Sequence, residues 1–343
     1  MNPYALSFII SSLALGTMTT LSSTHWILAW IGLEINTLAI IPVMTKTPHP
    51  RAIEATTKYF LTQAAASALL LFSSTMNAWM TGEWTIMSSS ELPSILTVSA
   101  LAIKLGIAPF HLWLPEVLQG LPIKTGLILS TWQKLAPMSI FIQLSNHTNL
   151  HLTLILGLTS MLFGGWNGIN QTQTRKILAF SSIAHLGWMT AILNLNPQLT
   201  FLNFLTYILL TSTLFLTFTL TDTKNLPELA TSWSKSPPLS ASALLTLLSL
   251  SGLPPLTGFM PKWLIAQEMI KQNLVMFTLI ILFSSLLSLF FYLRLTYIMS
   301  LTLSPNLSFS TFPWMTHKKN ILAPLTTLSL LLLPFTPLIW SLT

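Results

Sequence analysis

The sequence predicts an all-helical polytopic membrane protein. Only 7% of the 343 residues are charged and 52% are hydrophobic, which gives a mean hydropathy of +0.69. A soluble domain carries roughly a quarter charged residues. The 15 basic and 8 acidic residues are too few to cover a water-facing surface of this size. The composition therefore excludes a soluble globular enzyme, a nucleic-acid-binding domain and a disordered protein.

Apolar stretches of spanning length recur along the whole chain. A hydrocarbon core of about 30 Å needs about 20 apolar residues per helix. No extramembrane stretch is long enough to form a domain, so we expect a single membrane domain over residues 1–343. No basic region precedes the first stretch, so no cleavable signal peptide is expected. About eleven spans are predicted: residues 3–22, 25–45, 55–80, 93–120, 122–144, 150–168, 176–195, 198–221, 239–270, 274–299 and 321–341.

The loop charges agree with this count. If every stretch spans, eleven of the 15 lysines and arginines fall on one side, and only Lys271 falls on the other with Glu83, Glu91 and Glu268. Lysine and arginine collect on the untranslocated side, so we expect the N-terminus there and the C-terminus opposite. The eleven are Lys46, Arg51, Lys58, Lys124, Arg175, Lys176, Lys224, Lys235, Arg294, Lys318 and Lys319.

No motif in the sequence indicates a bound cofactor or metal. The absence of cysteine excludes disulfides, thiolate-held iron–sulfur clusters and covalently attached haem. We find no Gly-rich phosphate loop, dinucleotide fingerprint or catalytic Ser–His–Asp signature. We therefore expect this chain to bind no cofactor or metal, and any redox chemistry to belong to other subunits.

An internal repeat appears at an offset of 146 residues, in the strings KLGIAPFHLWLPE and LSGLPPLTGFMPK. Glycine and proline inside a span free backbone carbonyls, which survive in lipid only when buried or facing a wet cavity. We predict discontinuous helices around 106–115 and 252–261, in the fourth and ninth stretches, which run in opposite directions. Such inverted repeats indicate a transport pathway; coincidence among 21 prolines is the alternative. The matched residues are Gly106 and Gly252, Pro109 and Pro255, and Pro115 and Pro261.

Four charged residues lie deep in apolar stretches: Glu34, Lys104, Lys134 and Lys262. Each costs several kcal/mol to place there, so each needs a partner or a water-filled path. Glu34 and Lys104 both lie about 14 Å from the poorly charged side at 1.5 Å per residue. We predict that they form an intramembrane ion pair and that the lysines carry protons. A static pair that locks helix packing is the alternative.

Two histidines also lie inside the predicted spans. His185 is in the middle of the seventh stretch, and His111 follows the first predicted break. Either could relay protons between lysines, because histidine titrates near neutral pH. The alternative is a neutral histidine bonded to a carbonyl or hydroxyl group.

Four strings carry a resemblance to a known family. They are WIGLEINTLAI around Glu34, IKLGIAPFHLWLPEVLQG around Lys104, STWQKLAP around Lys134 and LSLSGLPPLTGFMPKW at Lys262. The chain resembles the antiporter-like membrane subunits of respiratory complex I over essentially its whole length. The resemblance implies that these four residues match the family's glutamate, two central lysines and terminal-channel lysine. It also implies two interlocked five-helix units, each with one discontinuous helix.

The resemblance implies an assembly as well. Longer members have fourteen helices, and the count of eleven resembles the animal version that lacks the first three. It implies the mitochondrial inner membrane, with the basic side in the matrix and the C-terminus in the intermembrane space. Other antiporter-like subunits, accessory subunits and lipid such as cardiolipin are the implied partners. NADH, FMN, iron–sulfur clusters and ubiquinone are implied only in other subunits.

The sequence therefore favours a proton-translocating subunit of NADH:ubiquinone oxidoreductase. Two alternatives stay open from the residues alone. A free-standing cation/proton antiporter would use the same charges and broken helices. A scaffold without a through-path would use its lysines only as packing ion pairs.

Overall fold

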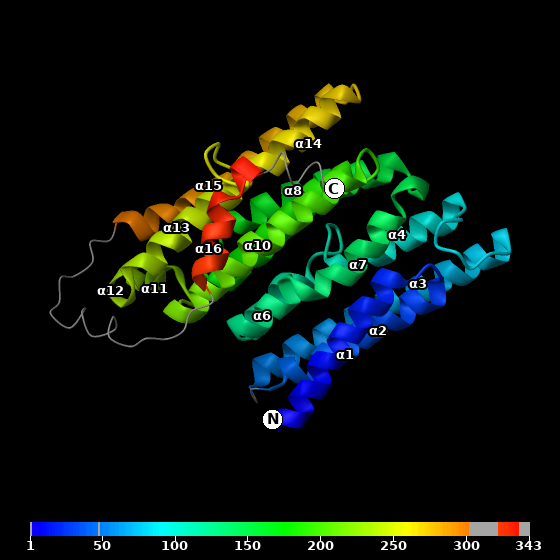
Figure 1. Ribbon diagram of the computed structural model, residues 1–343, viewed down its shortest axis with the longest axis horizontal. Coiled ribbons are helices and arrows are strands. Elements are labelled where there is room, and N and C mark those ends of the chain that lie inside the picture. Colours follow the sequence, from blue (N-terminus) through cyan, green and yellow to red (C-terminus); the bar gives the residue numbers. More distant parts are fainter. Residues whose placement is uncertain (1, 47–48, 302–321, 336–343) are drawn as a thin grey trace. The chain divides into compact units, whose positions relative to one another are not determined.

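The computed structural model describes residues 2–46, 49–301 and 322–335 (Figure 1). The chain divides into two compact units, an N-terminal unit (Met1–Ser160) and a C-terminal unit (Met161–Thr343). Within the described ranges the structure contains helices and no β-strand, so the all-helical prediction is confirmed. The N-terminal unit contains α1 (Pro3–Ser22), α2 (Trp26–Met44), α3 (Pro50–Thr81), α4 (Glu91–Leu105), α5 (Trp113–Gly120), α6 (Ile123–Ser130), α7 (Trp132–Gln143) and the start of α8 (Leu150–Ile169).

Helices α1 and α2 pack side by side at a glycine contact (Figure 1). A Cβ atom on Gly16 would lie 3.0 Å from the carbonyl oxygen of Gly32, and one on Gly32 would lie 2.9 Å from that of Gly16. Small residues of this kind let two membrane helices approach closely. The Asn36 amide reinforces the contact when it is oriented to satisfy both of its polar atoms, because it then donates to Leu13 O at 2.9 Å and accepts from Thr17 N–H at 3.3 Å.

Helix α4 ends in the middle of an apolar stretch because Gly106 adopts a left-handed conformation, with φ of 77°. The backbone N–H groups of Gly106 and Ile107 both donate to Ala102 O at 2.9 Å. This pattern satisfies carbonyls that a helix end leaves open. The indole of Trp113, at the start of α5, donates to Ile103 O at 3.0 Å. The carbonyl groups of Ala102 and Ile103, at the end of α4, thus accept hydrogen bonds from uncharged donors that follow them in the sequence.

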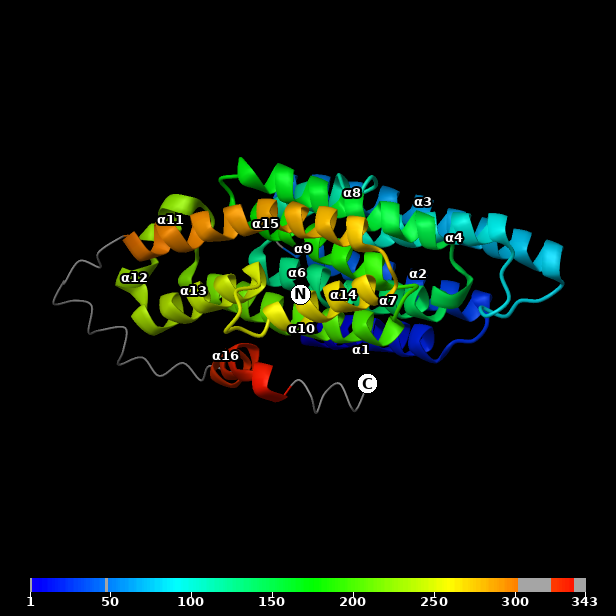
Figure 2. The same ribbon diagram turned by 90° about the horizontal axis from the view of Figure 1, so that it is seen from above.

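The C-terminal unit surrounds one buried helix. Every residue of α9 except Arg175 and Lys176 is buried, which is typical of a helix packed on all sides. Helices α13 and α15 run side by side in this unit (Figure 2). Its helices are α9 (Thr174–Ile192), α10 (Pro197–Thr221), α11 (Leu226–Ala230), α12 (Ser232–Lys235), α13 (Pro237–Ser251), α14 (Phe259–Lys271), α15 (Val275–Leu301) and α16 (Leu322–Leu331).

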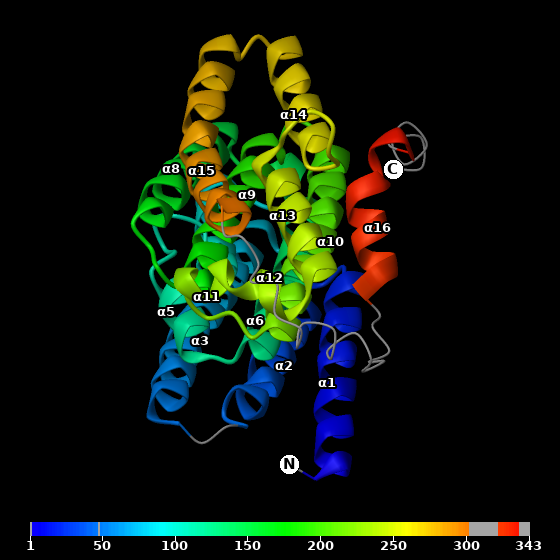
Figure 3. The same cartoon turned by 90° about the vertical axis from the view of Figure 1, so that its left-hand side faces the viewer.

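Helix α13 ends as α4 does. Gly252 has φ of 87°, its N–H donates to Ser249 O at 3.0 Å, and Leu253 N–H donates to Leu248 O at 3.4 Å. A short segment then leads into α14 (Figure 3). Within the described residues, each unit also carries an isolated backbone bridge directly before a helix: His25, before α2, pairs with Thr85, and Gln173, before α9, pairs with Asn225. The repeat found in the sequence therefore extends to backbone detail.

Five of the described helices are long and apolar enough to cross a membrane: α1, α2, α8, α10 and α15. The predicted stretch 122–144 is not one helix, because α6 and α7 are separated at Thr131. The Thr131 hydroxyl donates to Leu127 O at 2.7 Å, which supports this local interruption. Only part of the predicted stretch 321–341 is described, as α16 and the 3-10 turn Leu333–Phe335. Lys318 and Lys319 lie outside the described residues.

Replacing Gly32 with leucine should separate α1 from α2. Its Cβ would lie 2.5 Å from Thr19 Oγ1 and 2.6 Å from Thr20 Cγ2, in addition to the contact with Gly16 O. Overpacking of this kind typically destabilises by about 1–3 kcal/mol. Resistance of the membrane-embedded chain to limited proteolysis should fall. Ile31→Leu is the control, because Ile31 is 40% exposed on the same helix. Equal resistance of the two variants would contradict the glycine contact.

Candidate functional site

The N-terminal unit contains a small cavity that is lined by residues of α2, α3, α4, α5, α6 and α7. It offers about 20 Å³ to the centre of a water-sized sphere, which is room for about one water molecule. Two of the predicted site residues, Lys104 and Lys134, line it together. The remaining lining residues are Leu33, Asn36, Thr37, Tyr59, Gln63, Leu105, Trp113, Leu114, Leu129, Gln133, Ala136 and Pro137.

Lys104 reaches the cavity from the last turn of α4, directly before the glycine break. Its side chain is only 5% exposed. Within the described part of the chain, its Nζ atom has no hydrogen-bond partner. A buried ammonium without a partner is expensive, and structural lysines are rarely left this way. The position of Lys104 therefore suits a group that exchanges protons with molecules in the cavity.

The predicted direct ion pair between Glu34 and Lys104 is wrong. No nitrogen–oxygen contact within 4.0 Å joins these two described residues, and Glu34 Oε2 is buried without a hydrogen-bond partner. Lys104 lines the cavity whereas Glu34 does not. The carboxylate still acts electrostatically on Lys104 and on Tyr59, since charges interact over longer distances in a low dielectric. The two groups are near each other but separate.

Lys134 is placed by the interruption between α6 and α7. It lies one turn after Thr131, is 3% exposed, and lines the same cavity as Lys104. The preceding residue, Gln133, donates from Nε2 to Asn36 O at 3.2 Å. This bond ties α7 to α2 beside the lysine. The two central lysines are therefore brought to one cavity by two separate helices, α4 and α7.

His111 lies in the segment that joins α4 to α5, and its side chain is 4% exposed. Its backbone carbonyl accepts from Leu114 N–H at 3.1 Å, which forms the turn that leads into α5. His111 is not among the residues that line the cavity. The structure thus gives His111 a place in the broken segment but not in the lysine cavity.

Lys262 closes the second helix break. It stands in the first turn of α14 and its Nζ donates to Leu250 O at 3.2 Å and to Ser251 O at 2.9 Å. Both carbonyls belong to the last turn of α13, where the helix dipole is negative and favours a cation. Gly252 leaves room for this side chain, because a Cβ there would lie 3.0 Å from Lys262 Cδ and Nζ. The Lys262 ammonium therefore donates hydrogen bonds to the carbonyl groups at the end of α13, as the Trp113 indole does at the end of α4 in the N-terminal unit.

His185 lies in the middle of the buried helix α9 and contacts two tyrosines. The Tyr292 hydroxyl lies 3.4 Å from His185 Nε2, and the Tyr207 ring centroid lies 5.7 Å from that of His185. Both tyrosines are 1% exposed. They form a buried polar cluster in the C-terminal unit that sequence reasoning missed. A phenol within a predicted span is the only sequence signal that could have indicated it.

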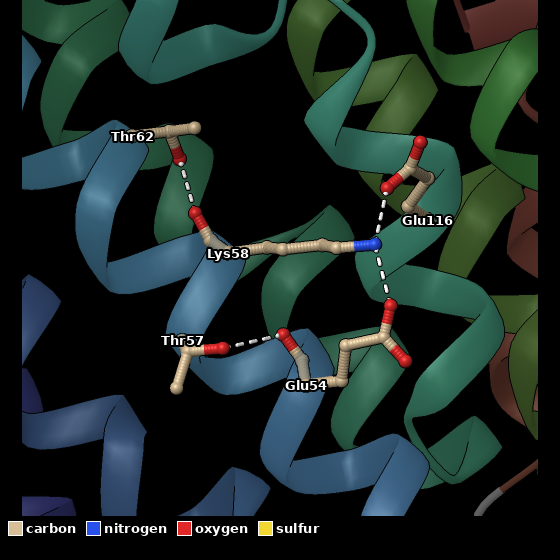
Figure 4. A network of polar contacts seen from close by, with 5 residues as sticks. All are labelled: Glu54, Thr57, Lys58, Thr62 and Glu116. Atoms are coloured by element: carbon tan, nitrogen blue, oxygen red, sulfur yellow. Dashed lines mark hydrogen bonds and ion pairs between the residues drawn. The ribbon is translucent and has the colours of Figure 1, made fainter.

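A second feature that sequence reasoning missed is an ion-pair network between α3 and α5 (Figure 4). Lys58 Nζ lies 2.6 Å from Glu54 Oε1 and 2.7 Å from Glu116 Oε2. The three side chains are 42–62% exposed, so the pairs stabilise the fold little by themselves. Their effect is to link α5 to α3 beside the cavity. Glu116 stands 146 residues before Lys262, so the repeat carries opposite charges at this position.

Within the described ranges, no group of three or more histidine, aspartate or glutamate side chains could hold a metal ion. The titratable side chains of the candidate site and of the His185 cluster are three lysines, Glu34, two histidines and three tyrosines. This set can accept, hold and release protons.

Comparison with known proteins agrees with this chemistry. Residues 23–288 match the family described as NADH:quinone oxidoreductase/Mrp antiporter, and residues 289–340 match the NADH dehydrogenase subunit 2 C-terminus. NADH-ubiquinone oxidoreductase chain 2 of Aquarana catesbeiana is 59% identical over 98% of both chains. The same-named chain of Carassius auratus is 57% identical over the full length of both.

Solved structures share the fold. A chain of respiratory complex I from Thermus thermophilus aligns with a TM-score of 0.87 and 26% identity, over 99% of this chain and 80% of its own length. A chain of the Mrp complex from Dietzia sp. DQ12-45-1b aligns with a TM-score of 0.81 and 17% identity, over 96% of this chain and 75% of its own length. The second likeness concerns the fold alone. On this sequence and family evidence, the chain belongs to the NADH-ubiquinone oxidoreductase chain 2 family.

Proposed function

We propose that the chain is a core membrane subunit of complex I that carries or gates protons while electrons pass from NADH to ubiquinone elsewhere in the assembly. The observation that carries this proposal is the enclosed cavity lined by two buried lysines, Lys104 and Lys134. The names of the full-length relatives and the complex I structure support membership of that assembly.

In the proposed path, Glu34 sets the charge state of Lys104 through the electric field rather than through direct contact. A change in the position of the carboxylate would load or unload Lys104, because a nearby negative charge favours the ammonium form. The proton would pass to Lys134 through the shared cavity. Lys262 is the terminal carrier, and its release of a proton weakens its charge-assisted bonds to the α13 carbonyls.

Two histidines are proposed as relays. His185 has a phenol beside its ring nitrogen and lies in α9, the buried helix of its unit. His111 lies in the broken segment after α4 and is the weaker candidate, because it stands outside the cavity lining. A histidine can both accept and donate a proton through its two ring nitrogens.

The membrane topology is also a proposal. We propose eleven crossings, with α4 and α5, and α13 and α14, each crossing as one discontinuous helix. The mitochondrial inner membrane is the proposed location, with the N-terminus in the matrix and the C-terminus in the intermembrane space. Other antiporter-like subunits, accessory subunits and lipid such as cardiolipin are the proposed partners. NADH, FMN, iron–sulfur clusters and ubiquinone are proposed to bind other subunits only.

Replacing Lys134 with methionine tests proton transfer. The variant keeps most of the length of the side chain but removes the titratable group, so NADH-driven proton translocation should fall by about tenfold or more. Translocation is measured with the assembled enzyme in sealed vesicles. Lys124→Met is the matched control, because Lys124 is exposed at the start of α6, and it should translocate protons normally. Normal translocation by a fully assembled Lys134→Met enzyme would instead support a scaffold. Cation exchange by the isolated chain would support the antiporter.

The topology can be tested by cysteine labelling, because the chain has no cysteine of its own. Lys46 and Glu83 are exposed residues at opposite ends of the helices α2 and α3. A membrane-impermeant maleimide should label Lys46→Cys only from the matrix side and Glu83→Cys only from the intermembrane-space side. The label is read on the separated chain. The reverse pattern would overturn the proposed orientation, and labelling of both from one side would overturn the number of crossings.

A further inference from the structure

Within the described residues, the amide nitrogen of one further side chain that lines the lysine cavity has no hydrogen-bond partner. Gln63, on α3, is 4% exposed and lines the cavity. Within the described ranges its Nε2 atom has no hydrogen-bond partner, as is also true of Lys104 Nζ. Buried polar groups are nearly always bonded to protein or to ordered water. Two unpartnered donors that line one cavity therefore point to a ligand that accepts hydrogen bonds from both.

The cavity limits what that ligand is. About 20 Å³ for the centre of a water-sized sphere suits a single water molecule, which needs two to four polar partners. The unpartnered atoms are nitrogen donors, so a metal cation would find no suitable ligands among them. A larger organic molecule does not fit. Water satisfies the donors, because its oxygen accepts two hydrogen bonds and leaves two hydrogens to donate.

We propose that this cavity binds one water molecule and that Gln63 is the residue that positions it between Lys104 and Lys134. This inference rests on the proposed proton-carrying function. The Gln63 amide donates one N–H to the water oxygen, and the Lys104 ammonium donates to the same oxygen. In the transfer step Lys104 gives its proton to the water oxygen, and the water gives one of its hydrogens to the neutral amine of Lys134. The water is regenerated, and one positive charge moves from Lys104 to Lys134.

The neighbouring contacts keep Gln63 in a fixed place. One turn earlier on α3, the Tyr59 ring lies against Trp113, with ring centroids 5.8 Å apart. Trp113 is in turn held by Ile103 O. The ion pair of Lys58 with Glu116 joins the same two helices.

The two helices also meet at Gly120. A Cβ there would lie 2.6 Å from Arg51 O and 2.7 Å from Ala55 Cβ. The amide therefore projects from a helix that is anchored to α5 at several points, as a positioning role requires.

Replacing Gln63 with methionine tests the inference in the assembled enzyme. Methionine nearly preserves the shape but removes the amide. Loss of one hydrogen bond of about 1 kcal/mol should slow NADH-driven proton translocation by about fivefold. Because the hop between the lysines then limits the rate, the solvent deuterium isotope effect on translocation should rise. A purely structural role would not change the isotope effect.

Three further variants make the experiment decisive. Gln63→Asn keeps the amide on a shorter stem, so both its rate and its isotope effect should lie between those of the wild type and Gln63→Met. Gln143→Met is the matched control, because Gln143 ends α7 and does not line the cavity, and it should behave as wild type. Lys134→Met is measured in parallel. If Gln63→Met does not assemble, the isotope effect of Gln63→Asn carries the test.

The outcomes separate the two proposals. A wild-type rate and isotope effect in the assembled Gln63 variant, with translocation blocked in Lys134→Met, overturns the water site and leaves the function standing. Unchanged translocation in Lys134→Met overturns the function itself. A rate that depends on chloride concentration assigns the cavity to an anion and overturns the water site. A water peak within hydrogen-bond distance of Gln63 Nε2, in a density map of the assembled enzyme, supports it.

Discussion

The carbonyl groups freed at the two helix breaks are the constraint on which the structure depends. In apolar surroundings each unsatisfied carbonyl is costly, so each break must supply donors where α4 and α13 stop. Gly106 and Gly252 turn the chain in the same left-handed conformation and return backbone N–H groups to the last helical turn. One side chain from the following helix also donates to this last turn: Trp113 donates to Ile103 O, and Lys262 donates to Leu250 O and Ser251 O.

The use of Trp113 at one break and Lys262 at the other makes the two units chemically different although their backbones repeat. The indole N–H of Trp113 is neutral and keeps its proton, so it caps the first break whatever the charge of Lys104. The Lys104 side chain lines the cavity instead. The second break is closed by the ammonium of Lys262 itself, so the carrier and the cap are one group. At the position equivalent to Lys262 the N-terminal unit has Glu116, which pairs with Lys58 on α3 and anchors α5 beside the cavity. One repeated backbone thus supports a cavity in one unit and a charged cap in the other.

Most candidate residues were predictable, but their contacts were not. Glu34, Lys104, Lys134 and Lys262 stand out because charge is rare in apolar stretches. Depth along a helix suggested that Glu34 and Lys104 touch, yet depth does not give the direction in which a side chain points, and Lys104 points to the cavity instead. Gln63 is an uncharged residue that no pattern in one sequence distinguishes, and for Tyr207 and Tyr292 the only signal is a phenol within a predicted span. The sequence also gives no sign of the interruption at Thr131, because threonine is common inside helices.

By itself the sequence determined the all-helical class, the repeat with its two glycine breaks and the set of buried charges. These features follow from composition, spacing and the local conformational freedom of glycine, which act within a few turns of the chain. Only the tertiary structure decided that Lys104 and Lys134 share one cavity with Gln63, that Lys262 caps α13, and that Glu34 remains separate from Lys104. The cavity and the separation of Glu34 depend on how α2, α3, α4, α5 and α7 pack against one another, and the Lys262 cap depends on how α14 packs against α13. Such packing is set by side-chain shape at contacts between residues that are not neighbours in the sequence.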